Sequence, residues 1–163
     1  MKILLISSLA ISTPPLTYGG LERCVSEYAA GLQDLGHEVA VVASKGSSVP
    51  SGVTLIDTLP NWDSLTEEMK QGYAKADFAR DGQPYWFPTG NGWRAHEESS
   101  FQRYKDALDG FDVICDHSWA KWSYSSAKKE IVGTLHSQKS YNVRPPRERP
   151  LFTAVSHGHA RFT

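Results

Sequence analysis

Two adjacent glycines, Gly19 and Gly20, separate an apolar stretch from a helical pattern near the start of the chain. The surrounding residues read PPLTYGGLER, and apolar side chains recur at helical spacing over residues 20–35. Glycine lets the backbone approach a ligand closely, and the free N–H groups at a helix start attract anions. The pair therefore either offers main-chain donors to a phosphate or makes a tight turn that packs a helix against a sheet. It matches neither the dinucleotide fingerprint G-x-G-x-x-G nor the phosphate-loop pattern G-x-x-x-x-G-K-[ST].

Polar residues at the ends of later apolar runs form a second group that could do chemistry. The segments DHSW, TLHS and AVSHGH place His117, His136 and His157 where predicted strands end. Ligands of a parallel α/β sheet bind at the carboxyl ends of its strands, where the strand order reverses. The glycine turn and these three segments are therefore predicted to meet at one edge of a sheet.

Strands and helices that alternate along the chain must position these residues. The predicted strands are 2–7, 37–44, 52–57, 111–118, 130–137 and 151–156, and the predicted helices are 20–35, 63–80, 95–110 and 119–129. Short joints between them imply parallel strands with right-handed crossovers. We predict a single domain over residues 1–163 of class α/β, with a doubly wound, mostly parallel Rossmann-like sheet in the order 3-2-1-4-5-6.

Residues 58–110 interrupt this alternation and are predicted to form a helical and loop insertion after the third strand. Asp63 or Ser64 is expected to cap its first helix. The insertion is rich in aromatic residues, which are either a platform for sugar rings or a small core under a long loop. These aromatic residues are Trp62, Tyr73, Phe78, Tyr85, Trp86, Phe87 and Trp93.

The composition is that of an ordinary globular protein, with 40% hydrophobic and 21% charged residues among 163. The net charge of −1 gives no global basic field, so nucleic acid is not an expected partner. The chain from residue 121 onward contains eight basic residues and two acidic ones. This excess of positive charge either favours an anionic ligand or belongs to a solvated surface. The apolar start is short and broken by Ser7 and Ser8, which favours a buried strand over a signal peptide. No run is long enough for a transmembrane segment.

Cysteine and histidine usage bears on compartment and metal binding. Cys24 and Cys115 are expected to be free buried thiols, which suits a reducing cytoplasm, the predicted location. His157 and His159 have the spacing of a ligand pair, but no carboxylate or cysteine cluster completes it, so no metal site is predicted.

The motif PPLTYGGLERCV after an N-terminal strand resembles the opening of family 4 glycosyltransferases, in which P-P-x-x-Y-G-G-x-E-R recurs. Four later segments resemble that family in the same order. LGHEVAVVAS is similar to its G-H-E-V strand, and FDVICDHSW to D-V-I-H-x-H-S with Cys115 in place of the first histidine. VGTLHS is similar to T-x-H-G or T-x-H-D, and FTAVSHGHARFT to a strand ending in V-S before a helix. The resemblance covers the chain apart from residues 58–110.

The resemblance implies the GT-B fold of two Rossmann-like domains, with this chain as the N-terminal, acceptor-side domain. The family transfers a sugar from a nucleoside diphosphate donor with retention of anomeric configuration. Gly19 and Gly20 would then lie near the donor diphosphate, where their amides stabilise the charge on the leaving group. Amides and basic side chains can serve this purpose, so neither a metal nor a cofactor is expected, and the nucleotide sugar is a substrate.

The other matched residues would contact the sugars. His136 matches T-x-H and is the catalytic candidate, because an imidazole can hydrogen-bond the transferred sugar or the acceptor hydroxyl. Acceptor contacts are implied for Tyr18, His117 and Ser118. Glu22 and Arg23 match E-R, and could equally form a solvated first turn of the helix.

No second Rossmann-like unit and no suitably placed E-x7-E motif of the family's donor domain occur in these 163 residues. We therefore expect a longer or two-chain enzyme, of which this chain alone is inactive. It would hold a sugar or glycan acceptor and reach the nucleotide sugar through the missing C-terminal domain. An exposed apolar seam could also promote self-association.

Two alternatives from other classes remain. The first is a non-catalytic Rossmann-like module that binds a glycan or a phosphorylated ligand. The second is a nucleotide-binding oxidoreductase domain. It is disfavoured because the second strand ends in Ala43, Ser44 and Lys45, without an acidic partner for a ribose.

Overall fold

The fold is built on six strands and three α-helices in the computed structural model, which describes residues 1–78, 92–119, 122–123, 130–135 and 151–154. The strands are β1 (Lys2–Ile6), β2 (Glu38–Lys45), β3 (Thr54–Pro60), β4 (Val113–Asp116), β5 (Glu130–Leu135) and β6 (Leu151–Ala154). The helices are α1 (Gly20–Asp34), α2 (Glu67–Phe78) and α3 (Trp93–Tyr104), with short 3-10 turns η1 (Trp62–Ser64) and η2 (Lys105–Gly110). The structure thus confirms α/β as the fold class.

The strands form one sheet in the order β3-β2-β1-β4-β5-β6, and every neighbouring pair is parallel. The predicted doubly wound order is confirmed for β3-β2-β1-β4, and the backbones of β5 and β6 extend the sheet beyond β4. β1 is central and pairs with both β2 and β4, so it is buried on both faces and reads as an unbroken apolar run. The order reverses between β1 and β4, which is the switch point expected from the sequence.

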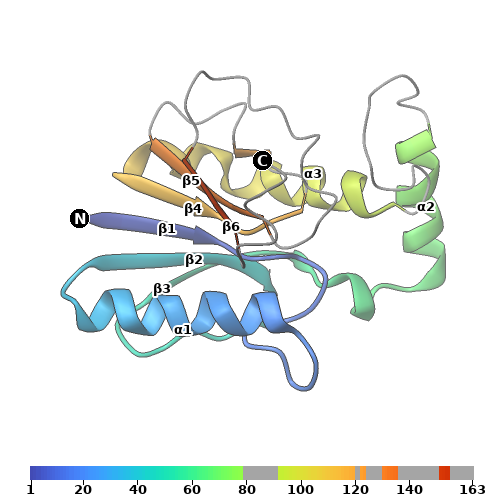
Figure 1. The fold of residues 1–163 in the computed structure, drawn as a ribbon. Helices are drawn as coiled ribbons and strands as arrows, with labels where there is room; N and C mark the ends of the chain where they lie inside the picture. Colours follow the sequence, from blue (N-terminus) through green and yellow to red (C-terminus); the bar gives the residue numbers. More distant parts are fainter. Residues whose placement is uncertain (79–91, 120–121, 124–129, 136–150, 155–163) are drawn as a thin grey trace.

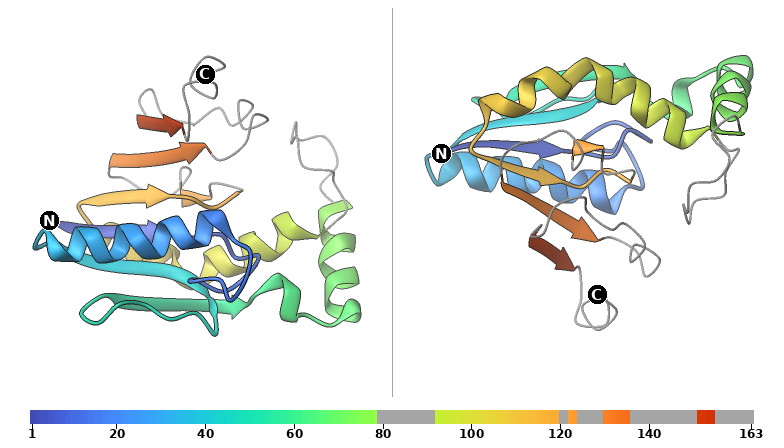
Figure 2. Two further views of the ribbon diagram at one scale, coloured as in Figure 1. Left: turned by 60° about the horizontal axis from the view of Figure 1, so that its bottom comes forward. Right: turned by 90° about the horizontal axis from the view of Figure 1, so that it is seen from above.

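Side chains that alternate along β1 face two separate core clusters. Ile3 and Leu5 pack with Val25 and Ala29 of α1 on one face, whereas Leu4 and Ile6 belong to a cluster on the other. That second cluster contains Phe101 and Tyr104 of α3, Leu108 of η2 and Ile114 of β4. Helices α1 and α3 therefore cover opposite faces of the sheet (Figures 1 and 2).

The segment expected as an insertion contributes to the main core through α3. Among the described residues of this segment, η1, α2 and the start of α3 lie beyond the carboxyl ends of the strands (Figure 1). The predicted cap of the first helix was wrong: α2 begins at Glu67, and the Met69 amide donates to Thr66 Oγ1 over 3.3 Å. The residues around Asp63 instead form η1, where Asn61 Oδ1 accepts from the Ser64 amide over 2.9 Å. The Asn61 side chain thus bonds a backbone amide in a short turn, which takes the place of the first turn of the predicted helix.

Several other expectations can be compared with the described residues. Strand β4 ends at Asp116, two residues earlier than predicted, and most of the predicted helix 119–129 lies outside the described part. Cys24 and Cys115 are free and partly buried. Within the part of the chain that the structure describes, no helix is long and apolar enough to cross a membrane.

Candidate functional site

The carboxyl ends of β1 and β4 form the centre of the candidate site. Beyond Asp116 the two strands stay joined, because the His117 amide donates to the Ile6 carbonyl over 2.8 Å. At the end of β1, the chain continues through a loop over residues 7–19 into α1, which runs back along the sheet (Figure 2). The ring of Tyr28 on α1 lies 5.8 Å from the ring of His117. The middle of α1 therefore lies beside the end of β4, and the first turn of the helix lies about 12 Å further along the helix axis, beyond this edge.

Hydroxyl groups hold the base of the 7–19 loop. Ser7 and Thr13 share a hydrogen bond of 2.7 Å between their side-chain oxygens, and both residues are buried. Ser44 Oγ donates to the Ile11 carbonyl over 3.0 Å, and the Thr13 amide donates to Ser47 Oγ over 2.9 Å. The end of β2 thus fixes the loop that leaves β1. This network explains why a run of small polar residues follows an apolar strand.

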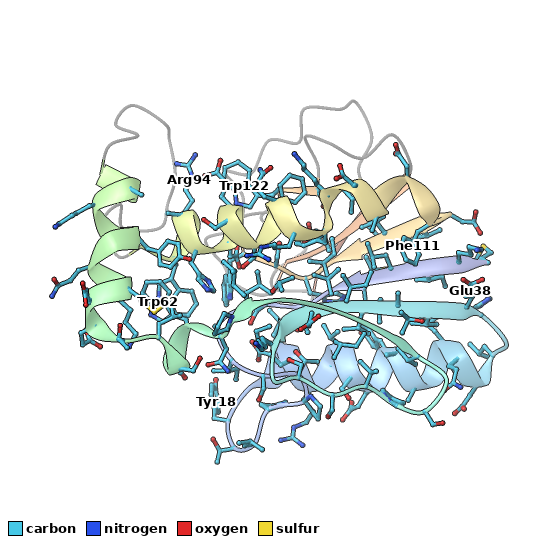
Figure 3. The ribbon with its side chains drawn as sticks, turned by 180° about the vertical axis from the view of Figure 1, so that it is seen from behind. Tyr18, Glu38, Trp62, Arg94, Phe111 and Trp122 are labelled. Carbon is cyan, nitrogen blue, oxygen red and sulfur yellow. The ribbon has the colours of Figure 1, made fainter. Side chains whose placement is uncertain are left out.

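The tip of the same loop projects into solvent. Leu16 and Tyr18 are 96% and 91% exposed, and Tyr18 points away from the sheet (Figure 3). Arg23 Nη2 donates to the Thr17 carbonyl over 3.3 Å and supports the tip from α1. Tyr18, which the resemblance implies in acceptor binding, is therefore accessible at the edge of the candidate site.

The two glycines of the turn differ in their surroundings. Gly19 is buried and has a φ of 156°, and an added Cβ would lie 2.6 Å from Ile11 Cδ1 and 2.7 Å from Pro15 Cβ. A side chain at this position would clash and be strained. Gly20 is exposed, and an added Cβ would meet no atom within 4 Å. The packing interpretation therefore applies to Gly19, while Gly20 leaves open space in front of the helix start.

The first turn of α1 has no side-chain cap. Gly19 cannot provide one, and the Arg23 amide makes the first helical hydrogen bond, to the Gly19 carbonyl over 3.0 Å. The preceding amides are the ones that an α-helix leaves without intrahelical partners. They carry the positive end of the helix dipole, to which an anion can bind.

Glu22 does not form part of a solvated first turn, which was one of the two expectations for this residue. Its side chain is buried and accepts a hydrogen bond from Ser8 Oγ, in the loop after β1. A glutamate at this helix position often reaches back to the capping amide. Here Ser8 holds it toward the loop, so the carboxylate connects α1 to the end of β1.

The end of β4 contains both residues matched to acceptor contacts. His117 is 1% exposed and packs beneath Tyr28, so its ring is covered from the side of α1. Ser118 is also buried, and its hydroxyl donates to Asp116 Oδ1 over 2.6 Å. The structure brings His117 against Tyr28 in the middle of α1 rather than against the glycine turn, and it engages the Ser118 hydroxyl internally. Direct contact of that hydroxyl with an acceptor would require this bond to break.

Two buried carboxylates lie under this turn and were not identified from the sequence. Asp116 is completely buried, and Glu97 of α3 is 4% exposed and accepts from the Trp119 amide over 3.2 Å. Burial, together with the negative charges of Asp116 and Glu97, raises the pKa of Tyr104 well above its usual value, so this phenol stays neutral. Burial and the charge of Asp116 likewise raise the pKa of Cys115. Neither the phenol nor the thiol is therefore prepared for nucleophilic chemistry.

The described aromatic residues of segment 58–110 form a small core rather than an open platform. Trp62 is buried, and its ring lies 5.8 Å from that of Trp93 and 6.2 Å from that of Tyr73. His96 packs edge-on against Tyr73 at 5.1 Å, and its Nε2 donates to the Pro60 carbonyl over 3.0 Å. This cluster fastens α2 and α3 to the end of β3. The side chain of Phe78 and residues Tyr85, Trp86 and Phe87 lie outside the described part.

Several predicted site residues cannot be placed. His136, the catalytic candidate, lies outside the described residues, as do His157 and His159. Among the side chains that the structure does describe, no group of three or more His, Cys, Asp or Glu residues could hold a metal ion.

Comparison with known proteins supports the motif-based interpretation. A search of curated proteins gave no significant match. The model of Glycosyltransferase Family 4 matches residues 18–162, which is most of the chain and includes the described turn at Gly19 and the end of β4. The resemblance seen in the sequence is thereby confirmed, and the chain belongs to glycosyltransferase family 4.

Proposed function

We propose that this chain is the acceptor-side domain of a retaining glycosyltransferase that uses a nucleoside diphosphate sugar. The observation that carries the proposal is the uncapped first turn of α1, which lies on the carboxyl-end side of the sheet, about two helical turns before Tyr28 and its neighbour His117. Its free amides and open Gly20 can receive the diphosphate of the donor. Because charge builds up on this group as the sugar departs, donors aimed at it lower the barrier to transfer.

The acceptor would lie on the other side of the same edge. Tyr18 offers an exposed aromatic ring, and aromatic faces pack against the apolar faces of sugar rings. His117 is the candidate polar contact from β4, and reaching it requires Tyr28 to move aside. His136 remains our candidate for the hydrogen bond to the transferred sugar. The amide and the hydroxyl of Ser118 both donate to Asp116 Oδ1, so a contact from either group to an acceptor requires one of these bonds to break.

One sheet edge provides one wall of a cleft. We therefore propose that a second, donor-binding domain closes around the sugar nucleotide, and that residues 1–163 alone bind without transferring. A sugar or glycan acceptor and this second domain are the proposed partners, and cytoplasm is the proposed location.

Diphosphate binding is tested by NMR titration of the chain with UDP-glucose and GDP-mannose. The amide resonances of Gly20, Leu21 and Glu22 should shift with one of the two donors, whereas amides of β3 should not. Glu27→Gln, which removes an exposed charge from α1, is the control and should show the same amide shifts as the wild-type chain. A titration with both donors that leaves the three amides unchanged would contradict the proposed contact.

Turnover is measured separately as release of UDP or GDP from the same donors, with glucose and mannose as acceptors. We expect no release above buffer from the isolated chain. Robust release would refute the need for a second domain. Saturable binding of a sugar with no response to either nucleotide would instead favour the alternative, a non-catalytic glycan-binding module.

A further inference from the structure

Asp116 accepts three hydrogen bonds from the turn that follows β4. The Ser118 amide and hydroxyl donate to Oδ1 over 2.8 and 2.6 Å, and Ser123 Oγ donates to Oδ2. Both serines and the aspartate are buried. A carboxylate has acceptor sites on both oxygens, so it can hold donors from two points of the turn at once. Bonds to a charged acceptor are also stronger than neutral ones.

A second carboxylate fastens the same turn to another element. Glu97 lies on α3 and accepts from the Trp119 amide, the next amide after Ser118. The turn is thus attached to β4 through Asp116 and to α3 through Glu97. Both carboxylates lie on the α3 face of the sheet, close enough to Tyr104 to affect its ionisation.

His117 lies on the opposite face because side chains alternate along a strand. Ile114 belongs to the core cluster under α3, while Cys115 packs with the cluster under α1. Continuing this alternation places Asp116 on the α3 side and His117 beneath Tyr28 of α1, as observed. Whatever fixes the backbone on either side of His117 therefore fixes the direction of its ring.

We propose that Asp116 is a positioning residue, which holds Ser118 and Ser123 from the α3 face and so orients His117 toward α1, with Glu97, which holds Trp119, as the second anchor. The relevance of this orientation to acceptor binding rests on the function proposed above. Asp116 itself contacts no substrate in this arrangement. Its role would be to keep the edge of the sheet preorganised before a ligand arrives.

The orientation of His117 can be measured without any sugar. We would compare the rate at which diethylpyrocarbonate modifies His117, followed by mass spectrometry of its peptide, in the wild-type chain and in Asp116→Asn. Asparagine keeps the size but removes the charge and replaces one acceptor oxygen by a donor. One of the present donations from Ser118 and Ser123 is therefore lost or reversed, and the bonds that remain are to a neutral acceptor. We expect His117 to react about tenfold faster, in line with the loss of a hydrogen bond to a charged group. His37, which directly precedes β2, is the internal reference and should react at an unchanged rate.

Hydrogen exchange separates local release from general unfolding. In Asp116→Asn and in Glu97→Gln, the amides of Ser118 and Trp119 should exchange faster while those of β2 stay protected. Asp112→Asn is the matched control, because this exposed carboxylate accepts from the Lys2 amide at the other end of β4. It should change neither readout.

Unchanged reactivity of His117 in folded Asp116→Asn would overturn the proposal, as would an equal rise in exchange at every amide. If Asp116→Asn does not fold, Ser123→Ala removes one donor and keeps the carboxylate, and it must then speed up His117 modification for the proposal to stand. A positive result combined with no binding of UDP-glucose or GDP-mannose would reject the proposed function and leave the role of Asp116 intact.

Discussion

A methyl group should have opposite consequences at the two neighbouring glycines. In Gly19→Ala the Cβ meets Ile11 and Pro15 at distances of 2.6 to 2.8 Å, and the φ of 156° is unfavourable for alanine. Overpacking and backbone strain of this kind cost about 1–3 kcal/mol each. In Gly20→Ala the Cβ points into open space at a helical position, so the free energy of unfolding should stay equal or rise by up to about 1 kcal/mol. Urea denaturation of both variants measures the difference, and equal midpoints would contradict the packing of Gly19.

Single residues also mark the limit of what the sequence could predict. The position of His117 at the switch edge followed from a strand that ends in polar residues, and the glycine turn followed from its place before a helix. The pairing of Glu22 with Ser8 and the three donors on Asp116 did not, because they join residues on different elements. A charged residue that occupies an inward position of an apolar strand was the available signal for Asp116.

At the scale of elements, the start of α2 gives a direct test of helix capping. The sequence favoured Asp63 or Ser64, whereas the Met69 amide donates to Thr66 Oγ1. Thr66→Ala should therefore lower the free energy of unfolding by roughly 0.5–2 kcal/mol. Asp63→Ala is the matched control and should change it by less than about 0.5 kcal/mol, since Asp63 is exposed within η1. Thermal or urea unfolding of the two variants decides the matter, and a larger effect at Asp63 would restore the original assignment.

His96 should make the junction of β3, α2 and α3 sensitive to acid. Burial lowers its pKa below the usual value of 6.5, although the bond to the Pro60 carbonyl opposes this shift. The unfolded chain therefore binds the proton more readily, and stability is fully present above pH 6.5 and falls as the pH drops toward the folded-state pKa. This loss is at most about 1.4 kcal/mol per pH unit.

The contribution of His96 is isolated by comparing urea midpoints of the wild-type chain and His96→Phe between pH 7.5 and pH 5. The variant keeps an aromatic ring but cannot be protonated, so its stability should depend less on pH. His37→Gln replaces a partly exposed histidine outside this junction and is the control variant. Parallel pH profiles for the wild type and His96→Phe would show that protonation of His96 does not affect stability.

Elements were predictable where one physical signal dominated. Continuous apolar runs identified β1 and β2, and the short helical connection between them indicated parallel pairing. The order β3-β2-β1-β4 followed from the doubly wound arrangement that this alternation implies. The aromatic cluster was ambiguous because stacking on a ligand and packing in a core use the same side chains. Among the described residues, the short ring distances from Trp62 to Tyr73, Trp93 and His96 decide for packing.

At the scale of the whole molecule, the three-layer arrangement of α1, sheet and α3 makes α3 essential and α2 peripheral, although both arise from the segment expected as an insertion. Phe101 is 5% exposed in the core cluster with Leu4 and Ile6, so Phe101→Ala should cost about 3–5 kcal/mol. That is a large part of the 5–15 kcal/mol that typically stabilises a domain. Met69 on α2 is 46% exposed and belongs to neither core cluster, so Met69→Ala should cost less than about 1 kcal/mol. Urea unfolding of both variants tests this contrast; comparable losses would mean that α2 supports the sheet as much as α3 does.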